Sequence, residues 1–160
     1  MRQALRDFPA TSAPAQSALH QWLAAKPDLR TVAIYAALPG EIDLSKITQL
    51  HPSLTWVFPK VLGHALTFHT GENLQPGAFG ILEPAAGSAE VPMAQIDAFI
   101  CPGLAFDPQG GRLGRGRGFY DRMLSNTRSD AFKIGICFPC QIVPNTFPEP
   151  HDVSMDVVLY

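Results

Sequence analysis

The 160-residue sequence has only three cysteines and no long apolar run, and both shortages narrow what the chain can be. A segment needs roughly 18–20 apolar residues to cross a bilayer, and no segment approaches that length. The first sixteen residues are interrupted by charge and proline, so they lack the apolar core of a secretory signal. We therefore expect a cytoplasmic protein with no membrane partner.

Two of the cysteines, Cys137 and Cys140, form a C-x-x-C pattern, which is typical of redox and zinc sites. A structural zinc site needs two further ligands, and the sequence has neither a second such pair nor a paired histidine motif. Pro139 and Pro144 indicate a strand that leaves into a loop, whereas a thioredoxin-like cysteine lies at a helix N-terminus. We interpret the cysteines as core and loop residues.

Positive charge is not in excess either. The chain has 12 Lys and Arg against 14 Asp and Glu, for a net charge of −2, whereas general nucleic-acid binders are usually basic. We therefore expect no nucleic-acid partner. The hydrophobic content of 46% and charged content of 16% indicate a globular chain rather than a disordered one. The length predicts a single domain over residues 1–160, which we expect to be a monomer.

Several of the arginines are concentrated in one glycine-rich loop. The loop follows an apolar strand predicted over residues 96–101 and precedes an amphipathic helix, and its centre alternates glycine with arginine: Gly114, Arg115, Gly116, Arg117 and Gly118. Glycine lets the backbone approach a ligand, and N–H groups of a loop that enters a helix form an anion site. Arginine adds bidentate recognition of phosphate oxygens. The pattern predicts a phosphate-binding loop, and a solvated turn is the structural alternative.

Known phosphate motifs do not describe this loop. No Gly-Lys-Ser/Thr follows the glycines, so it is not a Walker motif, and Phe119 occupies a position where the dinucleotide fingerprint needs glycine. RNA-binding Arg-Gly segments are repetitive, whereas this one occurs once. Asp121 lies three residues after Gly118 on the first helical turn. A carboxylate there suits the helix dipole, and beside phosphates it could also hold Mg²⁺.

The rest of the chain alternates helical and strand patterns. Helices are predicted over residues 12–26 and 43–51, and strands over residues 31–36, 54–61, 65–69, 96–101, 133–138 and 155–160. This alternation predicts an α/β fold with a mostly parallel sheet. Residues 71–92 are rich in Gly, Pro and Ala and predict a long surface excursion of the kind that often binds ligands. Glu41 follows a central strand, where open α/β sheets bind ligands, although an ordinary carboxylate at a helix start is equally consistent.

The stretch PGLAFDPQGGRLGRGRGFYDRML closely resembles the signature of the 5-formyltetrahydrofolate cyclo-ligase family, also called methenyltetrahydrofolate synthetases. Weaker features occur in the same order along the chain: RQALR, IYAALPGEID, FPKV, FGILEP and HDVSMDVVLY. The resemblance implies a three-layer α/β/α sandwich like those of ribose-phosphate isomerases and CoA-transferases. It also implies ATP-dependent cyclisation of 5-formyltetrahydrofolate to 5,10-methenyltetrahydrofolate, with Mg²⁺, phosphorylation of the formyl oxygen, and release of ADP and phosphate. The alternative is a weakly active or inactive paralogue that binds folate or nucleotide on the same fold.

The resemblance also assigns roles to residues. It implies that the catalytic groups are Arg115, Arg117 and Asp121, and that Mg²⁺ is held by Asp121 and Asp152. The residues implied to bind ATP are Arg2, Arg6, Gly114, Arg115, Gly116, Arg117, Gly118, Phe119, Tyr120 and Asp152. Those implied to bind the reduced folate are Glu41, Phe79, Gly80, Ile81 and Pro84. Arg117 stands where lysine is common in the family, and Phe119 where tyrosine is common.

Overall fold

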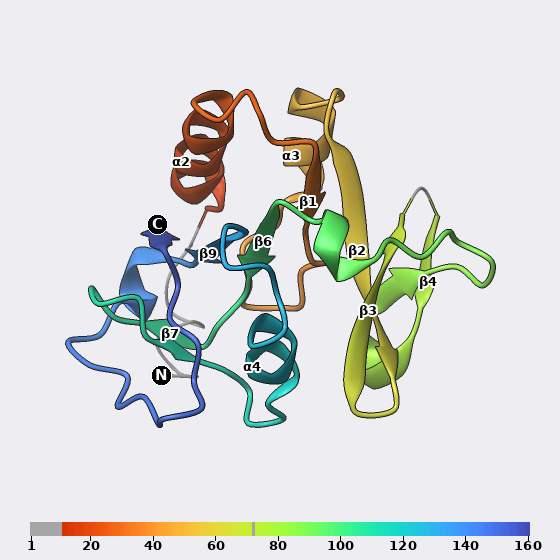
Figure 1. Ribbon diagram of the computed structural model, residues 1–160. Coiled ribbons are helices and arrows are strands. Elements are labelled where there is room, and N and C mark those ends of the chain that lie inside the picture. The colour runs from red at the N-terminus through yellow and green to blue at the C-terminus, as the bar shows by residue number, and fades with distance from the viewer. Residues whose placement is uncertain (1–10, 72) are drawn as a thin grey trace.

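The computed structural model describes residues 11–71 and 73–160, and its centre is a six-stranded sheet with strand order β10-β9-β6-β1-β2-β3 (Figure 1). The strands are β1 (Thr31–Ala33), β2 (Thr55–Leu62), β3 (Ala65–Thr70), β6 (Ala98–Cys101), β9 (Phe132–Ile136) and β10 (Val157–Leu159). Neighbouring strands are parallel, except that β3 runs antiparallel to β2. The predicted mostly parallel sheet is confirmed.

The central strands are short and buried on both faces, as the apolar sequence runs predicted. All four residues of β6 are buried, which is usual where helices or loops cover both faces of a parallel sheet. Strand β1 is shorter than the predicted 31–36 run. The Ile34 N–H still donates to the Val57 carbonyl, but the chain then leaves the sheet toward Glu41. This early exit brings the loop after β1 over the carboxyl edge of the sheet.

Helices α2 (Ala13–Ala24) and α3 (Ser45–Leu50) cover one face of the sheet, and α4 (Phe119–Leu124) covers the other (Figure 1). Helix α2 buries Ala15, Leu19 and Leu23, which recur every fourth residue and therefore lie on one side of the helix. Pro14 suits the first turn of α2, because its missing N–H has no intrahelical partner there. The helix therefore forms where its pattern predicted it.

Two hydrophobic cores lie on opposite faces of the sheet. Val32 and Ile100 point to the core beneath α2 and α3, whereas the adjacent Ala33 and Phe99 point to the core beneath α4. Because side chains alternate across a strand, each central strand contributes to both cores. On the α4 side, the rings of Phe68 and Phe99 meet edge to face with centroids 5.5 Å apart. This arrangement confirms the expected three-layer α/β/α sandwich.

Two small hairpins lie outside the main sheet. The predicted excursion over residues 71–92 contains β4 (Leu74–Pro76) and β5 (Leu82–Pro84), which pair with each other, and the chain after β6 forms β7 (Ala105–Phe106) and β8 (Arg112–Leu113). Among the described residues, three single 3₁₀ turns complete the elements, at Ala78–Gly80, Met93–Gln95 and Pro139–Gln141. All three cysteines are free thiols. Within the described ranges, no helix is both long and apolar enough to span a membrane.

Asp107 fixes the loop between β7 and β8. It is 2% exposed, and its carboxylate accepts hydrogen bonds from the N–H groups of Gln109, Gly111 and Thr146 and from the Thr146 hydroxyl at 2.6–3.0 Å. Burial alone would raise the pKa of Asp107, but these hydrogen bonds outweigh it and lower the pKa below its usual value. The Asp107 carboxylate thus holds together two segments that are distant in the sequence, residues 107–111 and the loop at Thr146.

Replacing Asp107 with alanine should lower the free energy of unfolding at pH 7 by about 3 kcal/mol, because one buried and three part-buried donors lose their acceptor. The folded pKa of Asp107 lies below the unfolded value, so its stabilisation is present above about pH 4 and is lost as the pH falls through the folded pKa. Urea unfolding of wild type and variant at pH 7 and pH 3 measures this effect. The difference between their free energies of unfolding should be smaller at pH 3 than at pH 7. Asp130→Asn, at an exposed side chain, is the control. A difference in the free energy of unfolding that is the same at both pH values would contradict the stabilising role of the Asp107 carboxylate.

Candidate functional site

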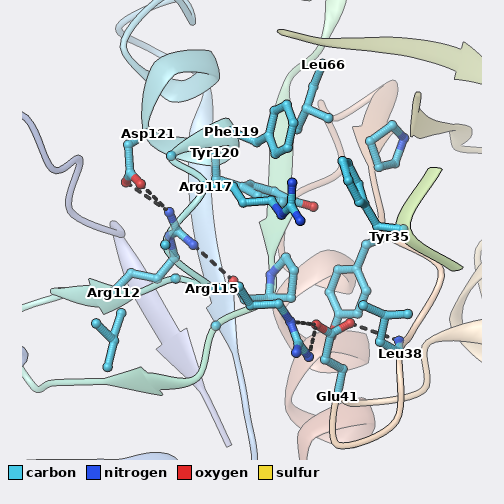
Figure 2. Close-up of a pocket in the computed structure, with 18 of the residues that line it drawn as sticks. Tyr35, Leu38, Glu41, Leu66, Arg112, Arg115, Arg117, Phe119, Tyr120 and Asp121 are labelled. Atoms are coloured by element: carbon cyan, nitrogen blue, oxygen red, sulfur yellow. Dashed lines mark hydrogen bonds and ion pairs between the residues drawn. The ribbon is translucent and has the colours of Figure 1, made fainter. Parts of the chain in front are cut away.

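A pocket of about 620 Å³ opens at the carboxyl edge of the sheet, beside the ends of β1 and β6 (Figure 2). These two strands are adjacent and parallel, but the chain continues from β1 to β2 on one side and from β6 to β9 on the other. Ligands bind open α/β sheets at such a switch point, because the two loops diverge there. The loops after β1 and β6 both line this pocket, together with residues from the β4–β5 hairpin and from the segment 146–152.

The glycine-arginine loop forms one wall of the pocket. All of its residues, Gly114–Gly118, line the cavity. Gly116 has a φ of 85° and Gly118 a φ of 65°, a left-handed backbone that side chains disfavour, so glycine is required at both positions. The loop enters α4 directly, and the phosphate-binding role predicted for it stays a prediction.

Arg112 and Asp121 form an ion pair in the same wall. Nη2 of Arg112 donates to both carboxylate oxygens at 2.9 Å, and Nη1 donates to the Pro102 carbonyl at 3.3 Å (Figure 2). The Arg112 side chain is only 3% exposed, and its Nε is buried without a partner among the described residues. Arg112 lines the pocket, but its guanidinium is engaged by Asp121 and the Pro102 carbonyl. A buried arginine needs an acid, but nothing in the sequence identifies Asp121 as that acid.

The two carboxylates predicted to hold Mg²⁺, Asp121 and Asp152, line the same cavity. Each oxygen of Asp121 accepts one hydrogen bond from Arg112, and Asp152 accepts one from the Glu149 N–H at 2.7 Å. No cluster of three or more His, Cys, Asp or Glu that could hold a metal occurs in residues 11–71 and 73–160. Mg²⁺ in phosphate sites takes only one or two carboxylates, and these oxygens keep free lone pairs, so the donor set fits. The assignment stays a prediction.

Arg115 and Glu41 meet across the pocket. Nε and Nη2 of Arg115 donate to Oε1 of Glu41 at 3.2 and 2.9 Å, and the Leu38 N–H donates to Oε2 at 3.0 Å (Figure 2). The Glu41 side chain is 8% exposed and that of Arg115 is 45% exposed. A residue predicted to bind ATP is thus paired with one predicted to bind folate, and both oxygens of Glu41 already accept hydrogen bonds.

Arg117 lies over an aromatic ring. Its guanidinium carbon is 3.9 Å from the centroid of Phe79, and the rings of Phe79 and Phe119 are 6.2 Å apart. Phe79 is 55% exposed and has a φ of 58°, which is a strained backbone conformation for a bulky residue. Strained backbone conformations of this kind are frequent at functional sites. Arg117 and Phe79 therefore form a cation–π contact between the glycine-arginine loop and the β4–β5 hairpin, with Phe119 beside the Phe79 ring.

The pocket has an apolar half and a polar half. The apolar half is formed by side chains of β2, β3 and the β4–β5 hairpin: Pro59, Val61, Leu66, Phe79 and Ile81, with the carboxylate of Glu83 among them. The polar half is formed by the arginine loop and residues 146–152. Tyr35 also lines the pocket. It donates its hydroxyl to the Ile42 carbonyl at 3.1 Å, and burial, with the nearby Glu41 carboxylate, raises its pKa well above the usual value.

The pocket brings together most of the residues that the sequence singled out. Those lining it are Glu41, Phe79, Ile81, Gly114–Gly118, Phe119, Tyr120, Asp121 and Asp152. Gly80 and Pro84 are not in the lining: Gly80 turns the hairpin with a φ of 74°, and Pro84 pairs with Leu74 across it. Arg2 and Arg6 lie outside the described residues. Glu83, which is part of the quoted FGILEP segment, also lines the cavity.

Comparison with known proteins gives a consistent result. A model of the 5-formyltetrahydrofolate cyclo-ligase family matches residues 15–160. A 5-formyltetrahydrofolate cyclo-ligase from Haemophilus influenzae is 31% identical over 171 residues, covering 98% of this chain and 88% of that protein. One from Mycolicibacterium smegmatis is 34% identical over 157 residues, covering 89% and 79%.

Two solved structures share the fold. A 5,10-methenyltetrahydrofolate synthetase from Mycoplasma pneumoniae superposes with a TM-score of 0.78 at 25% identity, covering 93% of this chain and 84% of that chain. One from Aquifex aeolicus gives a TM-score of 0.75 at 30% identity, covering 91% and 77%.

Proposed function

The chain belongs to the 5-formyltetrahydrofolate cyclo-ligase family, and we propose that its pocket catalyses ATP-dependent cyclisation of 5-formyltetrahydrofolate to 5,10-methenyltetrahydrofolate. The observation that carries the proposal is that one cavity is lined both by the glycine-arginine loop and by apolar side chains of β2, β3 and the β4–β5 hairpin. The first suits a triphosphate and the second a flat heterocycle. A reaction that transfers phosphate to a folate needs both in contact.

The reaction joins two steps. The formyl oxygen attacks the γ-phosphorus of ATP and ADP leaves, which makes the poor leaving group of a formamide into a phosphate. The N10 amine of the folate then attacks the formyl carbon, the carbon–oxygen bond breaks, inorganic phosphate departs, and N10 loses its proton. Little covalent chemistry falls to the protein, so catalysis consists of positioning and charge stabilisation.

The residues of the pocket can supply both. Arg115 and Arg117 stand on the wall where the phosphates would lie, and they would neutralise charge on the transferring phosphoryl group. The N–H groups of Gly114–Gly118 would contact the remaining phosphate oxygens. Mg²⁺ bound with ATP would neutralise further phosphate charge, and Asp121 and Asp152 are the residues that would hold it. Phe79 and Ile81 would border the pteridine ring.

Purified protein incubated with ATP, Mg²⁺ and 5-formyltetrahydrofolate should develop the near-ultraviolet absorbance of the methenyl product, with ADP released in equal amount. Omitting ATP is the control, because without it the formyl oxygen is not activated. Folded protein that binds folate tightly by calorimetry but gives neither absorbance nor ADP would reject the proposal and favour the inactive binding paralogue.

A further inference from the structure

Glu83 is a buried acid within the apolar half of the pocket. It lies on β5 and is 7% exposed, and it forms no ion pair within the described residues. Burying a carboxylate among apolar side chains is costly unless hydrogen-bond donors compensate. The hydrogen-bond donors that the protein supplies to Glu83 therefore show which carboxylate oxygen can still accept a hydrogen bond from a ligand.

One oxygen of Glu83 is engaged by the fold. Its Oε1 accepts a hydrogen bond from the Val61 N–H at 3.2 Å. Strand β1 ends at Ala33, opposite Val57, so β2 continues past its parallel neighbour, and this overhang presents the Val61 N–H (Figure 1). Glu83 thus attaches the β4–β5 hairpin to the sheet through a single oxygen.

The second oxygen of Glu83 accepts no hydrogen bond from residues 11–71 or 73–160. It is also absent from the fully buried unpartnered side-chain atoms of that part of the chain, so it keeps some accessible surface, and Glu83 is a lining residue of the cavity. Residue 77 is glycine where any side chain would collide with the carboxyl group, which leaves the carboxylate room in this position. An acceptor that faces an otherwise apolar wall is a recognition element for a ligand N–H.

The other acid of the pocket is differently placed. Glu41 accepts hydrogen bonds from Arg115 and the Leu38 N–H, and its charge is balanced by the guanidinium. Glu83 lines the same cavity as the apolar side chains of Pro59, Val61, Leu66 and Ile81. Glu83 therefore suits a flat heterocycle that carries N–H donors on its edge, because such a ring fills the apolar space and supplies the missing donors.

We propose that Glu83 recognises the amino-pyrimidinone edge of the pteridine ring, accepting hydrogen bonds from the 2-amino group and the adjacent ring N–H. This inference rests on the proposed function, since that function supplies the pteridine. A carboxylate is the matching partner for two neighbouring N–H donors, and hydrogen bonds to a charged acceptor are the stronger kind. Glu83 is thereby a specificity-determining residue, whereas Glu41 orients the Arg115 guanidinium by accepting its hydrogen bonds.

The test is the Glu83→Gln variant, whose amide oxygen can still accept from the Val61 N–H but whose NH₂ group opposes the ligand donors. KM is measured for 5-formyltetrahydrofolate and for its analogue with methyl in place of the 2-amino group. Wild type should favour the amino form by roughly 10- to 100-fold. The variant should reduce that ratio to about threefold or less, with the KM for ATP unchanged. Glu90→Gln, an exposed acid outside the pocket lining, should keep the wild-type ratio.

A purely structural role for Glu83 would affect both ligands equally, so an unchanged ratio in the variant overturns the inference even if its melting temperature falls. Wild type that does not distinguish the two ligands overturns it as well, and this measurement does not require the variant to fold. Wild type that cyclises neither compound overturns the proposed function, and the inference with it. The two failures are therefore separable.

Discussion

Asp121→Asn is expected to lower both stability and turnover, because the carboxylate has a structural partner as well as its predicted ligand role. Its two oxygens accept from Arg112 at 2.9 Å, and the Arg112 side chain is 3% exposed. Removing one member of a buried pair leaves the other charge uncompensated. We expect a loss of about 3 kcal/mol in the free energy of unfolding, measured without ATP or Mg²⁺.

Asp121→Asn should also lower kcat by more than the removal of an exposed surface charge would. Without its acid, Arg112 loses the contact that ties it to α4, and the glycine-arginine loop connects β8, which carries Arg112, to that helix. Displacement of the glycine-arginine loop, the proposed phosphate site, should reduce kcat by about 100-fold, since small displacements at a reacting centre are costly.

Unfolding in urea and steady-state cyclisation should be measured on the same preparation. Asp130→Asn removes a carboxylate that is 76% exposed and also paired with an arginine, so it is the matched control and should change stability by less than about 0.5 kcal/mol. Wild-type stability in Asp121→Asn, with activity restored by excess Mg²⁺, would show that the residue is a metal ligand alone.

The sequence predicted the sheet, the helices and the central loop because each depends on local pattern. The apolar runs that became β6 and β9, and the four-residue spacing of Ala15, Leu19 and Leu23, carry their own signal. The loop was predicted because glycine and arginine have distinctive chemistry within a few residues. The end of β1 was not predicted correctly, because it depends on where the chain leaves the sheet and not on the local apolar pattern.

The pairings within the site could not be predicted in the same way. Arg115 and Glu41 are 74 residues apart, and a guanidinium beside a carboxylate depends on how two loops fold over the sheet. Glu83 illustrates the same limit: its burial depends on the overhang of β2 and on the space left by Gly77. Residue types indicated the chemistry of the pocket, while the partner of each charge required the three-dimensional arrangement.

Arg115 and Glu41 should be strongly coupled in catalysis. Arg115→Ala is expected to lower kcat/KM for ATP by about 100-fold or more, because the cation proposed to neutralise the phosphoryl group is lost. Glu41→Gln should cause a loss of similar kind, because Oε1 of Glu41 accepts both hydrogen bonds that orient Arg115. In the double variant, the second change should then add little to the first.

A double-mutant cycle on kcat/KM for each substrate measures this coupling. If Glu41 instead contacts the folate directly, Glu41→Gln will raise the KM for folate alone, and the two changes will multiply rather than overlap. Arg128→Ala breaks another arginine–carboxylate pair, with Asp97, outside the pocket lining, and should leave both kcat/KM values near wild type. Since Glu41 is the less exposed partner and also holds the Leu38 N–H, its substitution should disturb the loop after β1 as well, so ATP and folate parameters should change together.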